Sequence, residues 1–297
     1  MAFVRAPATI SRRVRAMKQR VFFTIILALC VTAAHAQNIK VKGSAELLPI
    51  VDRWANSYTK AHPGTPVLSL GGGTSVGINS LADGSADIAT AERALTETET
   101  HALRSPIDIV FATDALVFVV HPTNPVKSIT MEQLHDVYSG KITNWMELGG
   151  ANLPIHAMAI GPNFGMTSLV QEKILKGGRW GANVRIAASE HDLLYSVWQD
   201  PAAISYSGMA LGKEFKHLAI AKEKGAQAYN ATTENIQAGR YTLIHPVHLY
   251  LTERTSPAAK EFVSWTLGHE GQQMVANSGI WMLSTTERER SRSHLKQ

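Results

Sequence analysis

The chain has 297 residues, of which 45% are hydrophobic and 18% charged, and its formal net charge is +5. The basic excess comes from the first 20 residues, because residues 37–297 carry 23 Lys and Arg against 24 Asp and Glu. The composition excludes a disordered chain, and the near-neutral balance after residue 36 excludes a basic nucleic-acid-binding surface.

Residues 1–36 have the three parts of a secretory signal peptide. A basic stretch ends at Arg20, an apolar run follows from Val21 to Ala34, and Ala34-His35-Ala36 is a cleavage pattern. The run is too short for a stable membrane span, although a retained anchor is the alternative. Lipidation of Cys30, the only cysteine, is a second alternative, but Leu29 is larger than the small residue that usually precedes a lipidated cysteine. We expect cleavage near Ala36 and a periplasmic or secreted protein.

Three short strands with intervening helices are predicted at the start of the mature chain, over residues 39–42, 66–70 and 87–91. The second strand runs into a glycine-rich turn, Gly71–Gly77, and then a helix through Leu81. Glycines let the backbone turn sharply, and the N–H groups at a helix start attract anions. The turn therefore predicts an anion-binding loop.

The same turn also reads Gly73-x-Ser75-x-Gly77, which is the spacing of a serine hydrolase nucleophile elbow. A hydrolase would use Ser75 as the nucleophile with a downstream acid and base such as Asp114 and His245. We treat this enzyme as the less favoured alternative, because glycine-rich turns produce the spacing by chance, and we expect no catalytic residues.

A second strand–turn–helix unit is predicted later in the chain. Strands are expected over residues 107–111 and 115–120, and Thr130 is expected to cap a helix over 131–138. Residues 155–160, 161–165 and 166–175 then predict a strand, a glycine turn and a helix. Further strands are predicted at 203–206 and 241–250, followed by an amphipathic C-terminal helix. The tail from Thr285 to Gln297 is expected to be solvated and frayed.

The late return strand and terminal helix predict that the C-terminus rejoins the first part of the chain. We expect an α/β protein of two lobes, with hinge crossings near residues 113–118 and 241–250 and a ligand cleft between the lobes. The predicted segments are the signal peptide at 1–36, lobe 1 at 37–115, lobe 2 at 116–243, the return to lobe 1 at 244–284, and a polar tail at 285–297.

Six segments over about residues 39–283 resemble a known family, in family order: 43–50, 71–95, 130–150, 203–206, 233–236 and 257–279. The chain resembles the substrate-binding proteins of bacterial phosphate ABC transporters, in the type II periplasmic binding protein superfamily. The resemblance implies a non-enzymatic, monomeric protein that captures phosphate or a related small oxyanion for an ABC permease. An orphan sensor or scavenger on the same fold is the alternative.

The resemblance also implies which residues hold the ligand. They lie in the first turn, the glycine-rich turn, the position after the third strand, and the second-lobe turn: Ser44, Ala45, Glu46, Gly73, Thr74, Ser75, Arg93, Gly165, Met166 and Thr167. Hydroxyls and helix-start N–H groups would donate to the anion, and an arginine would bind two of its oxygens.

Two features depart from the family pattern. Residues 160–167 replace the Arg-x-x-x-Ser-Gly-Thr segment, so the second-lobe arginine is absent. Ala45 and Glu46 stand where small hydroxyl residues are usual. Glu46 is either a carboxylate that the helix dipole favours, or a group that accepts a ligand proton or discriminates against a fully ionised anion. Arg93 is expected either to grip the ligand or to pair with Glu92 or Glu46.

No cofactor, structural metal or nucleic acid is expected. The only closely spaced histidines are His245 and His248, and no cysteine or carboxylate pattern completes a metal-ligand set around them.

Overall fold

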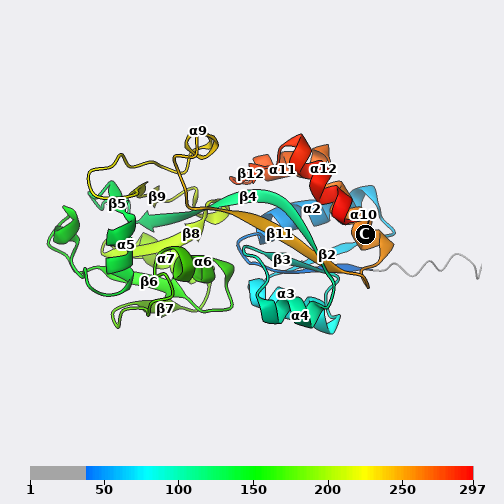
Figure 1. Cartoon of the computed structure of the whole chain (residues 1–297), viewed down its shortest axis with the longest axis horizontal. Helices are drawn as coiled ribbons and strands as arrows, with labels where there is room; N and C mark the ends of the chain where they lie inside the picture. Colours follow the sequence, from blue (N-terminus) through cyan, green and yellow to red (C-terminus); the bar gives the residue numbers. More distant parts are fainter. Residues whose placement is uncertain (1–37, 297) are drawn as a thin grey trace, which may run out of the picture. The chain divides into compact units, whose positions relative to one another are not determined.

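The structure is a computed structural model that describes residues 38–296 (Figure 1). The predicted signal peptide at 1–36 and its cleavage near Ala36 lie outside the described residues. Within residues 38–296, no helix combines the length and the hydropathy needed to cross a membrane.

The first part of the chain forms three parallel strands, β1 (Ile39–Gly43), β2 (Val67–Leu70) and β3 (Ile88–Ala91), close to the bounds predicted from sequence. Helix α2 (Leu48–Ala61) lies against one face of these strands, while α3 (Thr74–Asp83) and α4 (Glu97–Leu103) lie against the other (Figure 1). Because the three strands run parallel, the turns that follow them open at the same edge of the sheet.

One long strand replaces the two strands expected over residues 107–111 and 115–120. Strand β4 (Pro106–Val120) is continuous, and Thr113 and Asp114, expected between the two strands, lie within it. The strand β11 (Ile244–Thr252) runs antiparallel beside it, and the pairs Thr113–Pro246 and Asp114–His245 keep the two strands in register. Polar residues break an apolar pattern, but the strand continues through Thr113 and Asp114, which stay in register with β11.

The middle of the chain supplies the rest of the sheet, whose order is β2-β1-β3-β11-β4-β8-β6-β7. Thr130 caps helix α5 as predicted, because its side chain accepts a hydrogen bond from the Gln133 N–H. The elements of this part are β5 (Ser128–Thr130), α5 (Met131–Tyr138), η2 (Trp145–Leu148), β6 (His156–Ile160), α6 (Gly165–Lys173), β7 (Arg185–Ala187), α7 (Glu190–Gln199), β8 (Ala203–Gly208), α8 (Met209–Gly212), β9 (Lys216–His217), β10 (Ala219–Ala221) and α9 (Thr233–Gln237).

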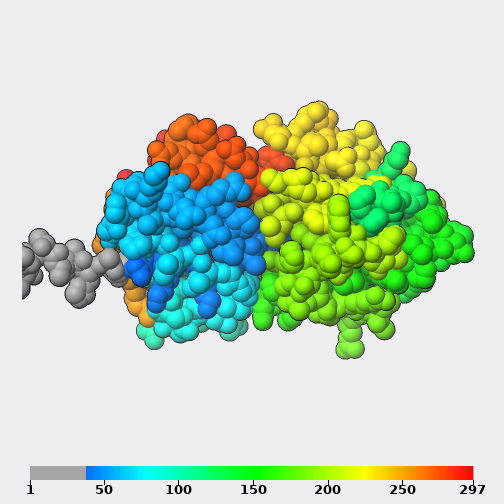
Figure 2. Space-filling model, turned by 180° about the vertical axis from the view of Figure 1, so that it is seen from behind, coloured from blue at the N-terminus to red at the C-terminus, as the bar shows by residue number. Residues whose placement is uncertain are grey.

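Residues 38–296 contain three apolar clusters, of which two belong to what we call the first lobe and one to what we call the second lobe. The main first-lobe core draws on residues 39–112 and 247–280, and the second-lobe core on residues 115–243. Strand β4 supplies Phe111 to the first core and Phe118 to the second, so Asp114 lies where the chain crosses between them. In Figure 2 the blue and cyan residues of the first lobe meet the green and yellow residues of the second along a seam.

The C-terminal part returns to the first lobe through α10 (Pro257–Thr266), α11 (His269–Ala276), β12 (Trp281–Met282) and α12 (Thr285–His294). The expectation of a frayed tail from Thr285 is wrong, because residues 285–294 form α12. Ser291 Oγ donates to the Val110 carbonyl at 2.7 Å, and His294 Nδ1 lies 2.9 Å from the Asp108 carbonyl. The helix is held along β4 by polar contacts, which a search for apolar residues overlooks.

We expect Ser284→Ala to lower the free energy of unfolding by about 1 kcal/mol, because Ser284 caps α12. The Ser284 hydroxyl accepts a hydrogen bond from the Glu287 N–H at 3.3 Å, and the Ser284 N–H donates to the Glu287 carboxylate at 2.8 Å. Urea unfolding measures the loss, and hydrogen exchange should show it as faster exchange in residues 285–294. The matched control is Ser293→Ala on the exposed side of the same helix, and an equal loss there would contradict the assigned cap.

Candidate functional site

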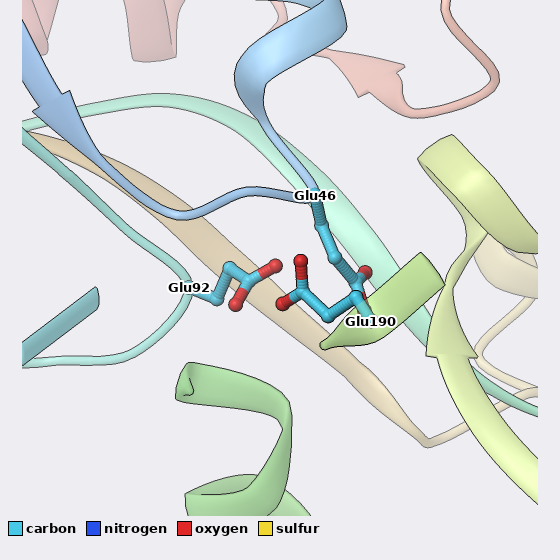
Figure 3. A group of neighbouring side chains, drawn as sticks. All are labelled: Glu46, Glu92 and Glu190. Carbon is cyan, nitrogen blue, oxygen red and sulfur yellow. The ribbon is translucent and has the colours of Figure 1, made fainter. Parts of the chain in front are cut away.

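Three glutamates from different segments meet between the two lobes (Figure 3). Glu46 lies in the loop before α2, Glu92 follows β3, and Glu190 is the first residue of α7. Each offers a carboxylate oxygen, and these oxygens all lie within 4.8 Å of one another. Figure 3 shows the three side chains pointing toward one another, so we call them the glutamate cluster.

The glutamate cluster is almost entirely removed from solvent. Glu46, Glu92 and Glu190 are 2%, 0% and 4% exposed. Glu46 Oε2 accepts a hydrogen bond from the Gly208 N–H at 2.5 Å, which crosses from the second lobe to the first. The carboxylate oxygens of Glu190 accept no hydrogen bond, and those of Glu92 have only the Ser44 hydroxyl and the Met166 N–H beside them. Among the described residues no lysine, arginine or histidine pairs with the cluster. Buried carboxylates without partners are costly and call for an explanation.

Asp114 extends this arrangement from the crossing strand β4. Its Oδ1 accepts hydrogen bonds from the N–H groups of Ala115 at 2.7 Å and Met209 at 3.0 Å, whereas Oδ2 is buried without a partner. Oδ2 lies beside Glu46 Oε2, since a Cβ atom on Gly208 would overlap both oxygens. A fourth carboxylate therefore faces the same buried space.

Burial raises the pKa of each of the four carboxyl groups. The pKa of Asp114 rises to about 7 and that of Glu190 to about 8, chiefly because burial disfavours the charged form. Burial, and then the charges of neighbouring carboxylates, raise the pKa values of Glu46 and Glu92 well above their ordinary range. Near neutral pH, these groups can therefore hold protons that exposed carboxylates would have lost.

Two helix starts face each other at the glutamate cluster. Helix α3 begins at Thr74 in the first lobe and α6 at Gly165 in the second. A Cβ atom on Gly165 would lie 2.8 Å from both Glu92 Oε2 and Thr74 Oγ1, so the two helix starts and Glu92 are in close contact. The backbone crosses there too, because the Ser75 N–H donates to the Asn163 carbonyl at 3.1 Å. Two positive helix ends thus point at one carboxylate.

Several residues predicted for the site lie at or beside this junction. Ser44 is buried, and its hydroxyl faces Glu92, where it acts to lower the pKa of that carboxyl group. Gly73 packs against the Asn163 carbonyl of the facing turn, and Met166 is fully buried with its methyl group near Gly208. Thr167 is turned toward its own lobe, because its hydroxyl donates to the Ile160 carbonyl at 2.9 Å.

Arg93 is placed with partners other than those expected. Its Nη1 and Nη2 donate to the two carboxylate oxygens of Glu99 at 2.7 and 2.8 Å, and Nη2 also donates to Ser75 Oγ at 3.0 Å. Pairing with Glu92 or Glu46 is therefore not what the structure contains. Because both Nη atoms of Arg93 donate to Glu99, the guanidinium is held against α4. Its hydrogen bond to Ser75 links the start of α3 to the same place.

The geometry also gives no support to a hydrolase centred on Ser75. Neither ring nitrogen of His245 has a hydrogen-bond partner, so no Ser–His contact exists. Burial lowers the pKa of His245 to about 3, which makes the ring a poor general base.

A cavity of about 820 Å³ adjoins the site on one side. Ala45, Gly72 and Glu190 line it at the lobe junction, and the rest of its wall is largely apolar: Phe164, Leu194, Tyr195, Trp198, Leu211 and Phe215. Neither Glu46 nor Glu92 lines this cavity, so Glu190 is the one member of the glutamate cluster that borders it.

Sequence reasoning missed Glu92 and Glu190 as site residues. The prediction placed the charged site residue after the third strand at Arg93, one position beyond Glu92, and successive residues in an extended segment point in opposite directions. Glu190 begins a helix that was not predicted, although Ser189 followed by acidic residues in the first turn is a helix-start signal.

Comparison with known proteins gives a consistent family. The profile of the PBP superfamily domain matches residues 31–270. The protein SphX of Synechococcus elongatus is 30% identical, over 81% of this chain and 76% of its own. The phosphate-binding protein PstS of Pseudomonas aeruginosa is 25% identical over 82% of both chains.

Among solved structures, one similar protein is a putative phosphate ABC transporter substrate-binding protein from Clostridium perfringens, crystallised with bound phosphate. It superposes with a TM-score of 0.77 at 26% identity, covering 84% of this chain and all of its own. The two-lobed α/β architecture predicted from sequence is confirmed as the type II periplasmic binding protein fold.

Proposed function

The chain belongs to the PBP superfamily, and on that premise we propose that it is an extracytoplasmic solute-binding protein that captures phosphate or a related small oxyanion for ABC-type uptake. Relatives that span most of this chain are named as phosphate-binding proteins, and the similar Clostridium perfringens structure holds phosphate. The proposal is for a binding protein without catalytic residues.

The observation that carries this proposal is the pair of facing helix starts. Helices α3 and α6 begin at Thr74 and Gly165, on opposite lobes and in contact across the junction. An oxyanion between them would receive N–H groups and hydroxyls from both lobes at once, so that its capture would favour lobe closure. Ser44, Gly73, Met166 and Thr167 belong to the turns around this point.

The carboxyl groups at this point favour a protonated oxyanion. A hydroxyl of hydrogen phosphate can donate to a carboxylate, and a protonated carboxyl can donate to a phosphate oxygen. Glu92, which lies against both helix starts, is the group we propose for this exchange, with Glu46 beside it. A fully ionised anion would be repelled by the same oxygens.

The lobe bounds, partners and location belong to the same proposal. We propose lobes at residues 37–115 with 244–284, and at 116–243, hinged on β4 and β11; the change of apolar core along β4 supports these bounds. The protein would act as a monomer, deliver its ligand to an ABC permease, and reach the periplasm after cleavage near Ala36.

Thermal unfolding in the presence of anions tests the proposal. At a phosphate concentration about 100 times the dissociation constant, binding should stabilise the protein by about 2.7 kcal/mol and raise the melting temperature by several degrees. Thr74→Val should reduce this shift, because it removes the hydroxyl at the start of α3 and keeps the side-chain shape.

Thr123→Val, an exposed threonine in the second lobe, is the matched control and should keep the full shift. Sulfate, molybdate, tungstate and phosphonates complete the panel. A wild-type protein that responds to none of these anions would refute the small-oxyanion assignment.

A further inference from the structure

We infer that Glu46, Glu92 and Glu190 form a binding site for a hard divalent cation such as Ca²⁺ or Mg²⁺. This site goes beyond the proposed oxyanion function, which assigns no metal to the protein. The two ligands would share the lobe junction, but each can be tested without the other.

The first support is the geometry of the cluster. Calcium binds carboxylate oxygens at Ca–O distances of about 2.3–2.6 Å, so two oxygens bound to one ion lie at most about 5 Å apart. The three glutamate oxygens all lie within 4.8 Å of one another, and they come from three separate segments (Figure 3). Glu46 and Glu92 belong to the first lobe and Glu190 to the second, so an ion held by all three would join the lobes.

The second support is an independent, unpartnered oxygen at the same place. Asp114 Oδ2 is fully buried, accepts no hydrogen bond, and shares one face of Gly208 with Glu46 Oε2. Asp114 comes from β4, and its Oδ1 accepts hydrogen bonds from the Ala115 and Met209 N–H groups. Only Oδ2 is therefore free to face the cluster. An oxygen left free in this position is what a bound cation, directly or through a coordinated water, would satisfy.

The charge of the surroundings points to a cation as the missing partner. Four carboxyl groups face one buried space, and among residues 38–296 no basic side chain forms an ion pair with any of them. Two helix starts contribute only partial positive charge there. A divalent ion supplies two full charges to the ionised form of these groups, which burial otherwise disfavours.

The size and chemistry of the site select the kind of cation. The adjoining cavity reaches the cluster only at Glu190 and is lined by neither Glu46 nor Glu92, so an organic amine in that cavity would meet one of the three carboxylates. A single small ion, by contrast, can contact all three glutamates at once, because their oxygens lie within 4.8 Å of one another. All the available donors are oxygens, which favours Ca²⁺, Mg²⁺ or Mn²⁺ over the softer ions that cysteine and histidine prefer.

The test is a titration of chelator-treated, full-length mature protein with CaCl₂ and with MgCl₂, followed by melting temperature and by calorimetry. We expect one of these ions to raise the melting temperature by several degrees and to bind with a stoichiometry of one. Glu46→Gln with Glu92→Gln should weaken the apparent affinity by at least about 10-fold, since removing even an indirect metal contact has that effect. The matched control, Glu97→Gln on the exposed face of α4, should bind as the wild type does.

Circular dichroism of the double variant confirms that it is folded before the titration. The inference is overturned if neither ion shifts the wild-type protein, if the double variant binds as tightly as the wild type, or if an alkylammonium ion shifts the protein and the metals do not. Phosphate added to the chelated wild-type protein forms a separate arm. A phosphate shift without a metal shift rejects the cation site alone, and a metal shift without a phosphate shift in either the chelated or the metal-loaded protein rejects the oxyanion function alone.

Discussion

Asp114→Asn is expected to raise the free energy of unfolding of the chelated, ligand-free protein by about 4 kcal/mol at pH 8, because burial lifts the pKa of Asp114 from its ordinary 3.8 to about 7. The substitution also supplies a donor where one is lacking. The asparagine oxygen can keep the bonds from Ala115 and Met209, while its NH₂ group faces Glu46 Oε2.

The sign of the pH dependence follows from the direction of this shift. Between about pH 4 and pH 7 the folded protein holds a proton on Asp114 that the unfolded chain has lost, so rising pH destabilises the wild type through this window. The variant cannot titrate at this position. The difference between the two proteins should therefore be small at pH 4, grow through the window, and level off above pH 7.

Urea unfolding of both proteins at pH 4, 6 and 8 measures this difference. Asp136→Asn is the matched control, because the hydrogen bond from His135, with help from Lys141, lowers the pKa of Asp136. That control should gain no stability at pH 8. If Asp114→Asn destabilises the protein at pH 8, then Asp114 is charged and well satisfied in the folded state. The inferred shortage of positive charge at the lobe junction would then be wrong.

Gly77→Ala should lower the free energy of unfolding by about 3 kcal/mol, although alanine is the better helix former. Gly77 lies inside α3, where exchanging glycine for alanine ordinarily stabilises a helix by about 1 kcal/mol. A Cβ atom there would overlap the Lys42 carbonyl and the Gly43 Cα, which are backbone atoms of β1 and cannot rotate away. The cost of overpacking should exceed the gain in helix propensity.

Gly64→Ala is the matched control, since no atom lies within 4 Å of the position a Cβ would take there. Its effect should stay within about 0.5 kcal/mol, as for most surface substitutions. Urea unfolding of both variants gives the comparison. A Gly77→Ala protein as stable as the wild type would mean that α3 and β1 do not approach as closely as the structure describes.

The fold could be predicted from the sequence wherever local sequence patterns agreed with the surroundings of those residues in the folded protein. Alternating residues 39–42 and the capped helix after Thr130 appear as predicted, because propensity, capping and burial agree there. The pattern failed where tertiary contacts decide. Thr113 and Asp114 lie inside β4 because β11 pairs with them, and residues 285–294 form a helix because Ser291 bonds to the edge of β4.

The candidate site was only partly accessible for a similar reason. Glycine turns and helix starts have local signatures, so Thr74 and Gly165 could be placed at the junction. Glu46 was identified from its place in the first turn. Its meeting with Glu92 and Glu190 depends on how two lobes pack, and residues 46, 92 and 190 carry no common sequence pattern. Arg93 shows the same limit, because its partner Glu99 lies on a helix that was not predicted.

Calorimetric titration of phosphate into the mature protein and its threonine variants tests the central claim most directly, because the titration measures ligand capture and the variants assign it to the lobe junction. The account predicts one phosphate per chain in the chelated or the Ca²⁺-loaded wild-type protein, and weaker binding in Thr74→Val than in Thr123→Val. Absence of phosphate binding under both conditions, or equal affinity in the two threonine variants, would contradict the assignment of an oxyanion to the facing helix starts.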